Sequence, residues 1–197
     1  MELSEGEGVY GRLGTLLFVK GAVKSDSNPE GPYWAAISET LSPDEEPPLV
    51  VYKCESGGGL VGFSIPGPGR IHPVSVDARS RIIVNRKAIV AASDSVQLGR
   101  MHLEGEDIGD TPPNMFVTVS GSGYVFLHGP GSLVDFNLAT NERMVVDGQM
   151  ILLLEGDVIH EPKPVGKPGQ TDPLPYIMLM HLTGPGRVIL YSMRNSA

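Results

Sequence analysis

The chain has 197 residues, of which 41% are hydrophobic, enough for a sizeable core without disulfides or metal. Its formal net charge of −8 argues against a surface for nucleic acid or anionic membranes. Cys54 is the only cysteine, so no intrachain disulfide can form and a reducing, cytoplasmic location is expected. No apolar run reaches the ~20 residues of a membrane helix. The opening MELSEGEG lacks the pattern of a signal peptide.

The first 48 residues predict two short strands followed by a long loop. The strands are expected at 9–10 and 16–19, with glycines around the turn between them. Residues 24–48 are rich in proline and polar side chains, which is typical of a loop. Within this loop, residues 33–41 are the one helix candidate, because their apolar side chains recur at helical spacing: Trp34, Ile37 and Leu41.

The rest of the chain alternates apolar strands with glycine and proline. Strands at 49–52 and 60–65 should flank a turn at 55–59. Two further polar loops are expected at 99–114 and 161–175. Glycine-rich segments lead into strands rather than helices, so we interpret them as hairpin turns and not as phosphate loops: 57–59, 121–123 and 184–186.

Internal repeats are the strongest signal in the sequence. Gly67 to Leu98 aligns without a gap on Gly129 to His160, with seven identical positions among 32. Leu3 to Val23 aligns in the same way on Leu138 to Val158, and Met178 to Ser192 aligns on Met115 to Gly129. The sequence therefore predicts a single compact β unit, 1–197, with internal repeats at 3–65, 76–131 and 138–192.

These patterns predict an all-β fold, an antiparallel sandwich or barrel built from repeated hairpin units. Asp147-Gly148 is a type I′ hairpin signal. Val119 and Phe126 are expected to pair across a hairpin. The run Leu152 to Leu154 and the apolar terminal strand 187–193 suggest surfaces that a subunit contact or the loops would cover.

Two segments resemble a known family, the altered-inheritance-of-mitochondria type proteins. They are SGSGYVFLHGPGSLVDFNLATNERMVVDGQMILLLEGDV and LTGPGRVILYS, and the opening LSEGEGVYGRLGTLLFVKGAV is also similar. The resemblance implies a duplicated double-stranded β-helix, like the tryptophan RNA-binding attenuation protein, assembled into trimers or larger rings. It implies no catalytic residues. The three polar loops replace apolar, glycine-rich segments of relatives, and any membrane contact made there does not carry over.

No residue pattern indicates a metal, a cofactor or an enzyme active site. The five histidines include no H-x-H pair, and His160 and Glu161 diverge because they are adjacent on a strand. Cys54 lacks a CxxC partner and is interpreted as packing. Arg81 and Arg143 are equivalent in two repeats, and we expect a salt bridge or a subunit contact there, with anion binding as the alternative.

Three functions stay open at this point. The first is a non-enzymatic oligomeric scaffold or interaction protein, with itself as partner, a trimer by resemblance, and possible further protein partners. The second is a small-ligand-binding protein with a site between subunits or subdomains, near Thr118, Ser120, His181 and Thr183. The third and weakest is a metal-dependent β-helix enzyme.

Overall fold

A computed structural model describes residues 1–26, 49–65, 67–101, 115–165 and 177–193. This part of the chain holds 16 strands and two short 3₁₀ turns, with every strand pairing antiparallel and no α-helix. The all-β prediction is thus confirmed. The helix candidate 33–41 and most of the three predicted loops lie outside the described residues.

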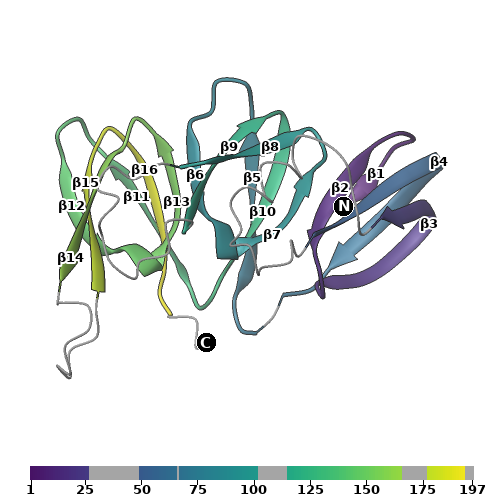
Figure 1. The fold of residues 1–197 in the computed structure, drawn as a ribbon, viewed down its shortest axis with the longest axis horizontal. Helices are drawn as coiled ribbons and strands as arrows, with labels where there is room; N and C mark the ends of the chain where they lie inside the picture. The colour runs from purple at the N-terminus through teal and green to yellow at the C-terminus, as the bar shows by residue number, and fades with distance from the viewer. Residues whose placement is uncertain (27–48, 66, 102–114, 166–176, 194–197) are drawn as a thin grey trace.

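The strands form three units, which lie in a row along the longest axis of the molecule (Figure 1). Unit 1 contains β1 (Glu2–Leu3), β2 (Gly8–Arg12), β3 (Leu16–Asp26) and β4 (Leu49–Phe63). Unit 2 contains β5 (Arg70–Val76), β6 (Ile82–Asn85), η1 (Arg86–Ala88), β7 (Ile89–Ser93), β8 (Val96–Arg100), β9 (Phe116–Gly121) and β10 (Gly123–Gly129). Unit 3 contains β11 (Leu133–Leu138), β12 (Arg143–Asp147), η2 (Gly148–Met150), β13 (Ile151–Gly156), β14 (Ile159–Val165), β15 (Ile177–Thr183) and β16 (Gly186–Tyr191).

The same pairing scheme recurs in each unit. In unit 3, β16 lies between β11 and β13, and β15 lies between β12 and β14. In unit 2, β10 lies between β5 and β7, and β9 lies between β6 and β8. In unit 1, the long β4 takes both central roles, with β1 and β2 on one edge and β3 on the other. Each unit is therefore a pair of three-stranded faces.

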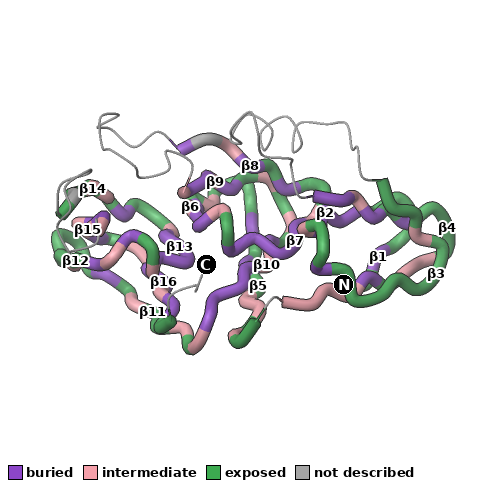
Figure 2. The backbone as a smooth tube through the Cα atoms, turned by 60° about the horizontal axis from the view of Figure 1, so that its bottom comes forward, coloured by how far each residue is buried: buried purple, intermediate pink, exposed green. Residues whose placement is uncertain are grey.

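Apolar side chains between these faces make three cores. One cluster is centred on unit 2 and includes Val84, Val117 and Leu127. A second lies in unit 3, around Met180 and Val188. A third lies inside unit 1. Figure 2 shows buried backbone running through all three units.

Adjacent units are joined by direct strand pairing. β13 of unit 3 pairs with β6 of unit 2, and β7 of unit 2 pairs with β2 of unit 1. Because of the first junction, β13 is buried on both faces: Ile151 and Leu154 enter the unit 3 cluster, while Leu152 and Leu153 enter the cluster centred on unit 2. The apolar run predicted to need a subunit or loop cover is covered by the chain's own strands.

β4 corrects one sequence prediction, since residues 55–59 are no turn between two strands but part of one curled strand. The rings of Tyr52 and Phe63 lie 5.8 Å apart, although eleven residues of straight strand would span about 36 Å. Gly57 and Gly58 have φ of 67° and 143°, and the pairing with β3 shifts register beside Gly21. Glycine and bulges supply this curl, which closes the two faces of unit 1 into a half-barrel.

The other predicted hairpins are also wrong, because their strands belong to different sheets. Gly121–Gly123 links β9 to β10, and 184–186 links β15 to β16, yet neither pair of strands is hydrogen-bonded together. Val119 accordingly pairs with β6 and β8, while Phe126 pairs with β5 and β7. These segments carry the chain across from one face to the other.

Asp147-Gly148 is likewise no type I′ turn. The Asp147 side chain accepts a hydrogen bond from the Gln149 N–H and so caps η2, which joins two strands of different sheets. Asn85 caps η1 in the same way, with its side chain accepting from Lys87. Asp followed by Gly is typical both of a hairpin turn and of a side-chain cap such as that of η2. The sequence alone therefore does not distinguish the two structures.

Two strand assignments also differ from expectation. Residues 161–165, predicted as loop, continue β14, where proline is tolerated because β14 is an edge strand within the described sheet. The terminal strand β16 is paired on both sides, by β11 and β13, and so offers no open edge.

Gly121 is expected to tolerate alanine far worse than Gly14. Both have positive φ, 101° and 82°, but a Cβ at Gly121 would lie 2.3 Å from the Ser95 carbonyl oxygen, while one at Gly14 meets nothing within 4 Å. Gly14→Ala should cost about 1–2 kcal/mol of unfolding free energy for the left-handed backbone alone, and Gly121→Ala at least twice that. Urea denaturation of both variants measures the free energy of unfolding. An equal decrease for the two would show that the close approach of the Ser95 carbonyl oxygen does not require glycine at 121.

Candidate functional site

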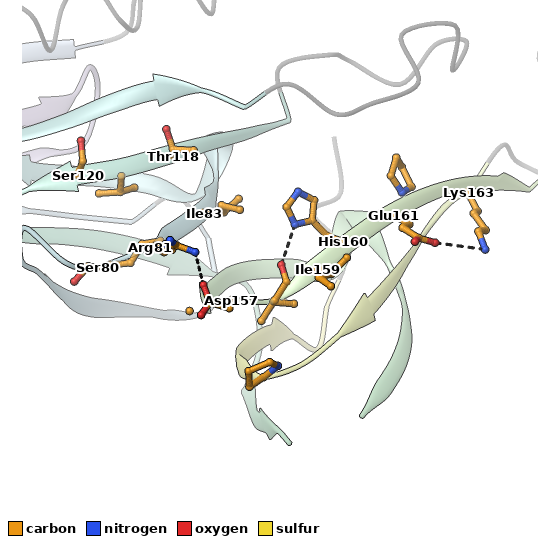
Figure 3. A pocket seen from close by; sticks show the side chains of 16 residues that line it. Ser80, Arg81, Ile83, Thr118, Ser120, Asp157, Ile159, His160, Glu161 and Lys163 are labelled. Carbon is orange, nitrogen blue, oxygen red and sulfur yellow. Dashed lines mark hydrogen bonds and ion pairs between the residues drawn. The ribbon is translucent and has the colours of Figure 1, made fainter. Parts of the chain in front are cut away.

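An open groove of about 1230 Å³ lies where units 2 and 3 meet. One wall is formed by β6 and β9, which contribute Ile83, Thr118 and Ser120. The opposite wall is formed by the end of β13 and by β14. Figure 3 shows the labelled side chains of both walls around this space. The groove exists because β13 pairs with β6, whereas the next strand, β14, pairs in the third sheet. Beyond Gly156 the chain therefore leads away from β6.

Polar groups line the groove, and several are already paired. Arg81 forms an ion pair with Asp157 across the junction of the two units. The Nδ1 atom of His160 lies 3.2 Å from the Val158 carbonyl oxygen, and the Lys163 Nζ lies 3.8 Å from a Glu161 carboxylate oxygen. The groove thus offers hydroxyls and charges of both signs over an aliphatic wall.

Half of the residues singled out in the sequence gather in this groove: Arg81, Thr118 and Ser120. The others, Arg143, His181 and Thr183, lie together on β12 and β15, where Arg143 is opposite Thr183 and Val145 is opposite His181. The two sets occupy equivalent strand positions, since Arg81 aligns with Arg143, Thr118 with His181 and Ser120 with Thr183. The second set faces no neighbouring unit in the described part of the chain.

The opposite wall was not predicted as a site from the sequence, where His160 and Glu161 entered only as a rejected metal pair. Glu161 and Lys163 were placed in a loop, because proline at 162 and 164 breaks the apolar pattern of β14. Asp157 was not singled out at all. Its position directly after Gly156 was the available signal, since this glycine matches Gly21 of the first repeat, ends β13 and turns the chain toward β14.

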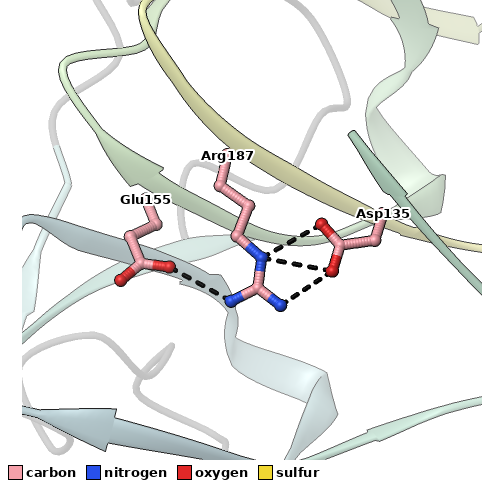
Figure 4. A network of polar contacts seen from close by, with 3 residues as sticks. All are labelled: Asp135, Glu155 and Arg187. Atoms are coloured by element: carbon pink, nitrogen blue, oxygen red, sulfur yellow. Dashed lines mark hydrogen bonds and ion pairs between the residues drawn. The ribbon is translucent and has the colours of Figure 1, made fainter. Parts of the chain in front are cut away.

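A second polar cluster, shown in Figure 4, is structural. The Arg187 guanidinium on β16 donates to Asp135 on β11, with Nη2 2.7 Å from Oδ2, and to Glu155 on β13, at 3.4 Å. The hydrogen bonds from Arg187 lower the pKa of the Asp135 carboxyl, and the same bonds raise the pKa of Arg187. Burial lowers the pKa of nearby His72, with the positive charge of Arg187 acting in the same direction. Arg187 ties three adjacent strands together.

The described residues contain no group of three or more His, Cys, Asp or Glu side chains placed to hold a metal ion. Within the same ranges, no helix has both the length and the apolar character to span a bilayer. Cys54 is fully buried in β4, with its Sγ 3.6 Å from the Ser56 carbonyl oxygen.

Fold and groove together define an all-β protein of three antiparallel units with a groove of mixed polar and apolar lining at a unit junction. Residues 1–193 match the family model described as mitochondrial biogenesis AIM24, and the chain belongs to this family. Its structure is similar to the crystal structure of protein SPYM3_0169 from Streptococcus pyogenes, with a TM-score of 0.74 at 18% identity over 98% of this chain and 87% of that one. A search of curated proteins finds no match. The family match confirms the resemblance seen in the sequence. The structural match, at 18% identity, shows a shared fold and nothing about function.

Asp135→Asn should destabilise the protein at neutral pH but not in acid. The pKa of Asp135 is depressed in the folded state, so its contribution is present above the unfolded value of about 3.9 and is lost as pH falls through the lower folded value. Because Asp135 is largely exposed, we expect about 1 kcal/mol or less. Denaturation from pH 7 to pH 2.5 measures it. In an Arg187→Met background the pH-dependent difference should disappear, and its persistence would contradict the pairing.

Proposed function

We propose that this protein is a non-enzymatic scaffold or interaction protein that works as a homo-oligomer and uses β3 for assembly. The observation that carries the proposal is the exposure of an apolar strand. Side chains of β3 are solvent-exposed by 43%, 65%, 47% and 39% at Leu16, Leu17, Phe18 and Val19. In the described part of the structure, β3 pairs only with β4, so its other edge is open.

Such an edge is costly for a monomer. An open, apolar edge strand is a template for pairing with another chain, and natural proteins normally blunt it with charge, proline or a cover. The segment Leu16–Val19 carries no charge and no proline, and the first charge is at Lys20. Burying each large apolar side chain contributes about 1.5–3 kcal/mol. Four neighbouring side chains therefore supply a strong drive for association.

We further propose three copies per assembly, related by closed rotational symmetry. The number rests on the resemblance to attenuation-protein-like rings, and closure is the usual arrangement of homo-oligomers. Each unit would then correspond to a double-stranded β-helix of that superfamily, with two three-stranded faces. The net charge of −8 supports protein rather than nucleic-acid partners.

Light scattering at micromolar concentration should give a multiple of 21.0 kDa for the purified chain. Leu17→Glu should lower the mass toward that of one chain, because a charge would be buried at the contact. Tyr124→Glu is the matched control, since Tyr124 is 51% exposed on β10, a strand paired on both sides. A parent chain that stays monomeric at this concentration would refute the proposal.

A second candidate function, small-ligand binding, is favoured by the groove between units 2 and 3. Its volume exceeds the roughly 300–1,000 Å³ of typical small-molecule pockets, and its walls combine Thr118 and Ser120 hydroxyls with the Arg81–Asp157 pair. A molecule with both polar and apolar parts suits such a lining, because aliphatic side chains such as Ile83 lie beside the hydroxyls and the ion pair.

The groove can be tested separately from assembly. A thermal-shift screen with free amino acids and nucleotides should raise the melting temperature by at least 2 °C for a binder. Thr118→Arg should abolish that shift by filling the groove, whereas Thr140→Arg, on an exposed turn of unit 3, should leave it unchanged. Failure of every compound to shift the parent protein would remove the ligand-binding candidate.

A further inference from the structure

The two internal junctions have the same register. At the junction of units 3 and 2, Leu153 is opposite Val84, Leu154 opposite Ile83 and Glu155 opposite Ile82. At the junction of units 2 and 1, the equivalent residues Ala91, Ala92 and Ser93 are opposite Gly11, Tyr10 and Val9. The sequence repeats place each of these pairs in the same position of the repeat. The junction is therefore a standard joint of this fold.

A backbone hydrogen bond just beyond each joint repeats as well. The Gly156 N–H donates to the Arg81 carbonyl oxygen at 2.9 Å. The equivalent Asp94 N–H donates to the Gly8 carbonyl oxygen at 3.1 Å. β7 is the repeat equivalent of β13, and β6 and β2 are the equivalents of β12. Each joint therefore pairs a strand equivalent to β13 with a strand equivalent to β12.

One strand of each type lies at an end of the row without such a partner in the described structure. β3 of unit 1 is the equivalent of β13 and β7, and it pairs only with β4. β12 of unit 3 is the equivalent of β6 and β2, and it pairs only with β15. Figure 1 shows β3 and β12 at opposite ends of the molecule, so they cannot pair within one chain.

Exposure at these two edges contrasts with burial at the internal joints. Leu152 and Leu153, the equivalents of Leu17 and Phe18, are fully buried at the joint of units 3 and 2. Val90 and Ala91, their counterparts in unit 2, are 2% and 1% exposed. Leu17 and Phe18 themselves are 65% and 47% exposed. On β12, Val145 is 52% exposed, whereas its unit 1 counterpart Tyr10 is 6% exposed.

We propose that β3 of one copy pairs antiparallel with β12 of the next copy, in the register of the internal joints. Phe18 then lies opposite Val146, Val19 opposite Val145, and Lys20 opposite Met144, and the Gly21 N–H donates to the Arg143 carbonyl oxygen. This inference rests on the proposed self-association and names its joint. The contact is head-to-tail, so repetition continues the row of units from chain to chain until rotation closes a ring.

The joint also completes a second groove. Arg143, His181 and Thr183 are the counterparts of Arg81, Thr118 and Ser120, and no described strand of the same chain forms an opposite wall for them. In the assembly, residues 22–26 of the copy that contributes β3 take the place of residues 157–161 as that wall. Ala22 stands where Asp157 pairs with Arg81, so the second groove keeps an arginine without that carboxylate. The groove between copies therefore favours a ligand with an anionic group.

Cysteine cross-linking tests the joint. Val19→Cys and Val145→Cys proteins are made separately, mixed and oxidised with oxidised glutathione, with the parent chain as control because its Cys54 is fully buried. The mixture should form a disulfide-linked dimer that neither variant forms alone. A chain carrying both substitutions should give a ladder or a closed ring on a non-reducing gel. Replacing Val145→Cys by Arg143→Cys moves the thiol two residues out of register and should slow cross-linking at least fivefold.

The outcomes separate the joint from the proposed function. A dimer formed by Val19→Cys alone would show symmetric β3–β3 pairing and overturn the head-to-tail joint. No mixed dimer, with a parent protein that light scattering finds oligomeric, would also overturn the joint and leave the scaffold proposal standing. A monomeric parent would overturn both. Equal cross-linking by Val145→Cys and Arg143→Cys would reject the register.

Discussion

Antiparallel pairing between neighbouring units is the constraint on which this structure depends. Each unit has two faces of only three strands, whose edge strands carry unpaired N–H and C=O groups unless a neighbour pairs with them. The β13–β6 and β7–β2 pairings join faces of neighbouring units into one six-stranded and one seven-stranded sheet, while β12, β15 and β14 remain a three-stranded sheet. They also bring Leu152 and Leu153 into the core of the neighbouring unit.

The repeat that makes the joints also makes the groove. β13 must leave the second sheet after pairing with β6, because Gly156 ends the strand and β14 pairs in the third sheet. That divergence opens the space that Arg81 and Asp157 span. A groove of this kind is thus a by-product of the joint geometry, and its chemistry is set by which side chains each repeat presents there. This is why Thr118 and Ser120 have counterparts in His181 and Thr183 rather than a unique constellation.

The sequence was sufficient for the strand content, the family and half of the groove, because alternation and gapless repeats are local signals. The sequence was insufficient to predict which strands pair with each other. Gly121–Gly123 and Asp147-Gly148 look like hairpin turns locally, whereas the structure uses them to cross between faces. The difference depends on contacts far along the chain, such as the Ser95 carbonyl oxygen against Gly121. Glu161 and Lys163 were missed for the opposite reason: prolines in β14 hid an edge strand.

Two edge strands of this chain, β14 and β3, differ in the side chains that they carry. β14 ends the third sheet with proline and charged side chains, which discourage further pairing. β3, by contrast, presents Leu17, Phe18 and Val19 at the end of the row, where its counterparts β7 and β13 are buried. One edge of this chain is thus protected by its sequence, while another stays apolar. This difference is the observation behind the proposed joint between copies.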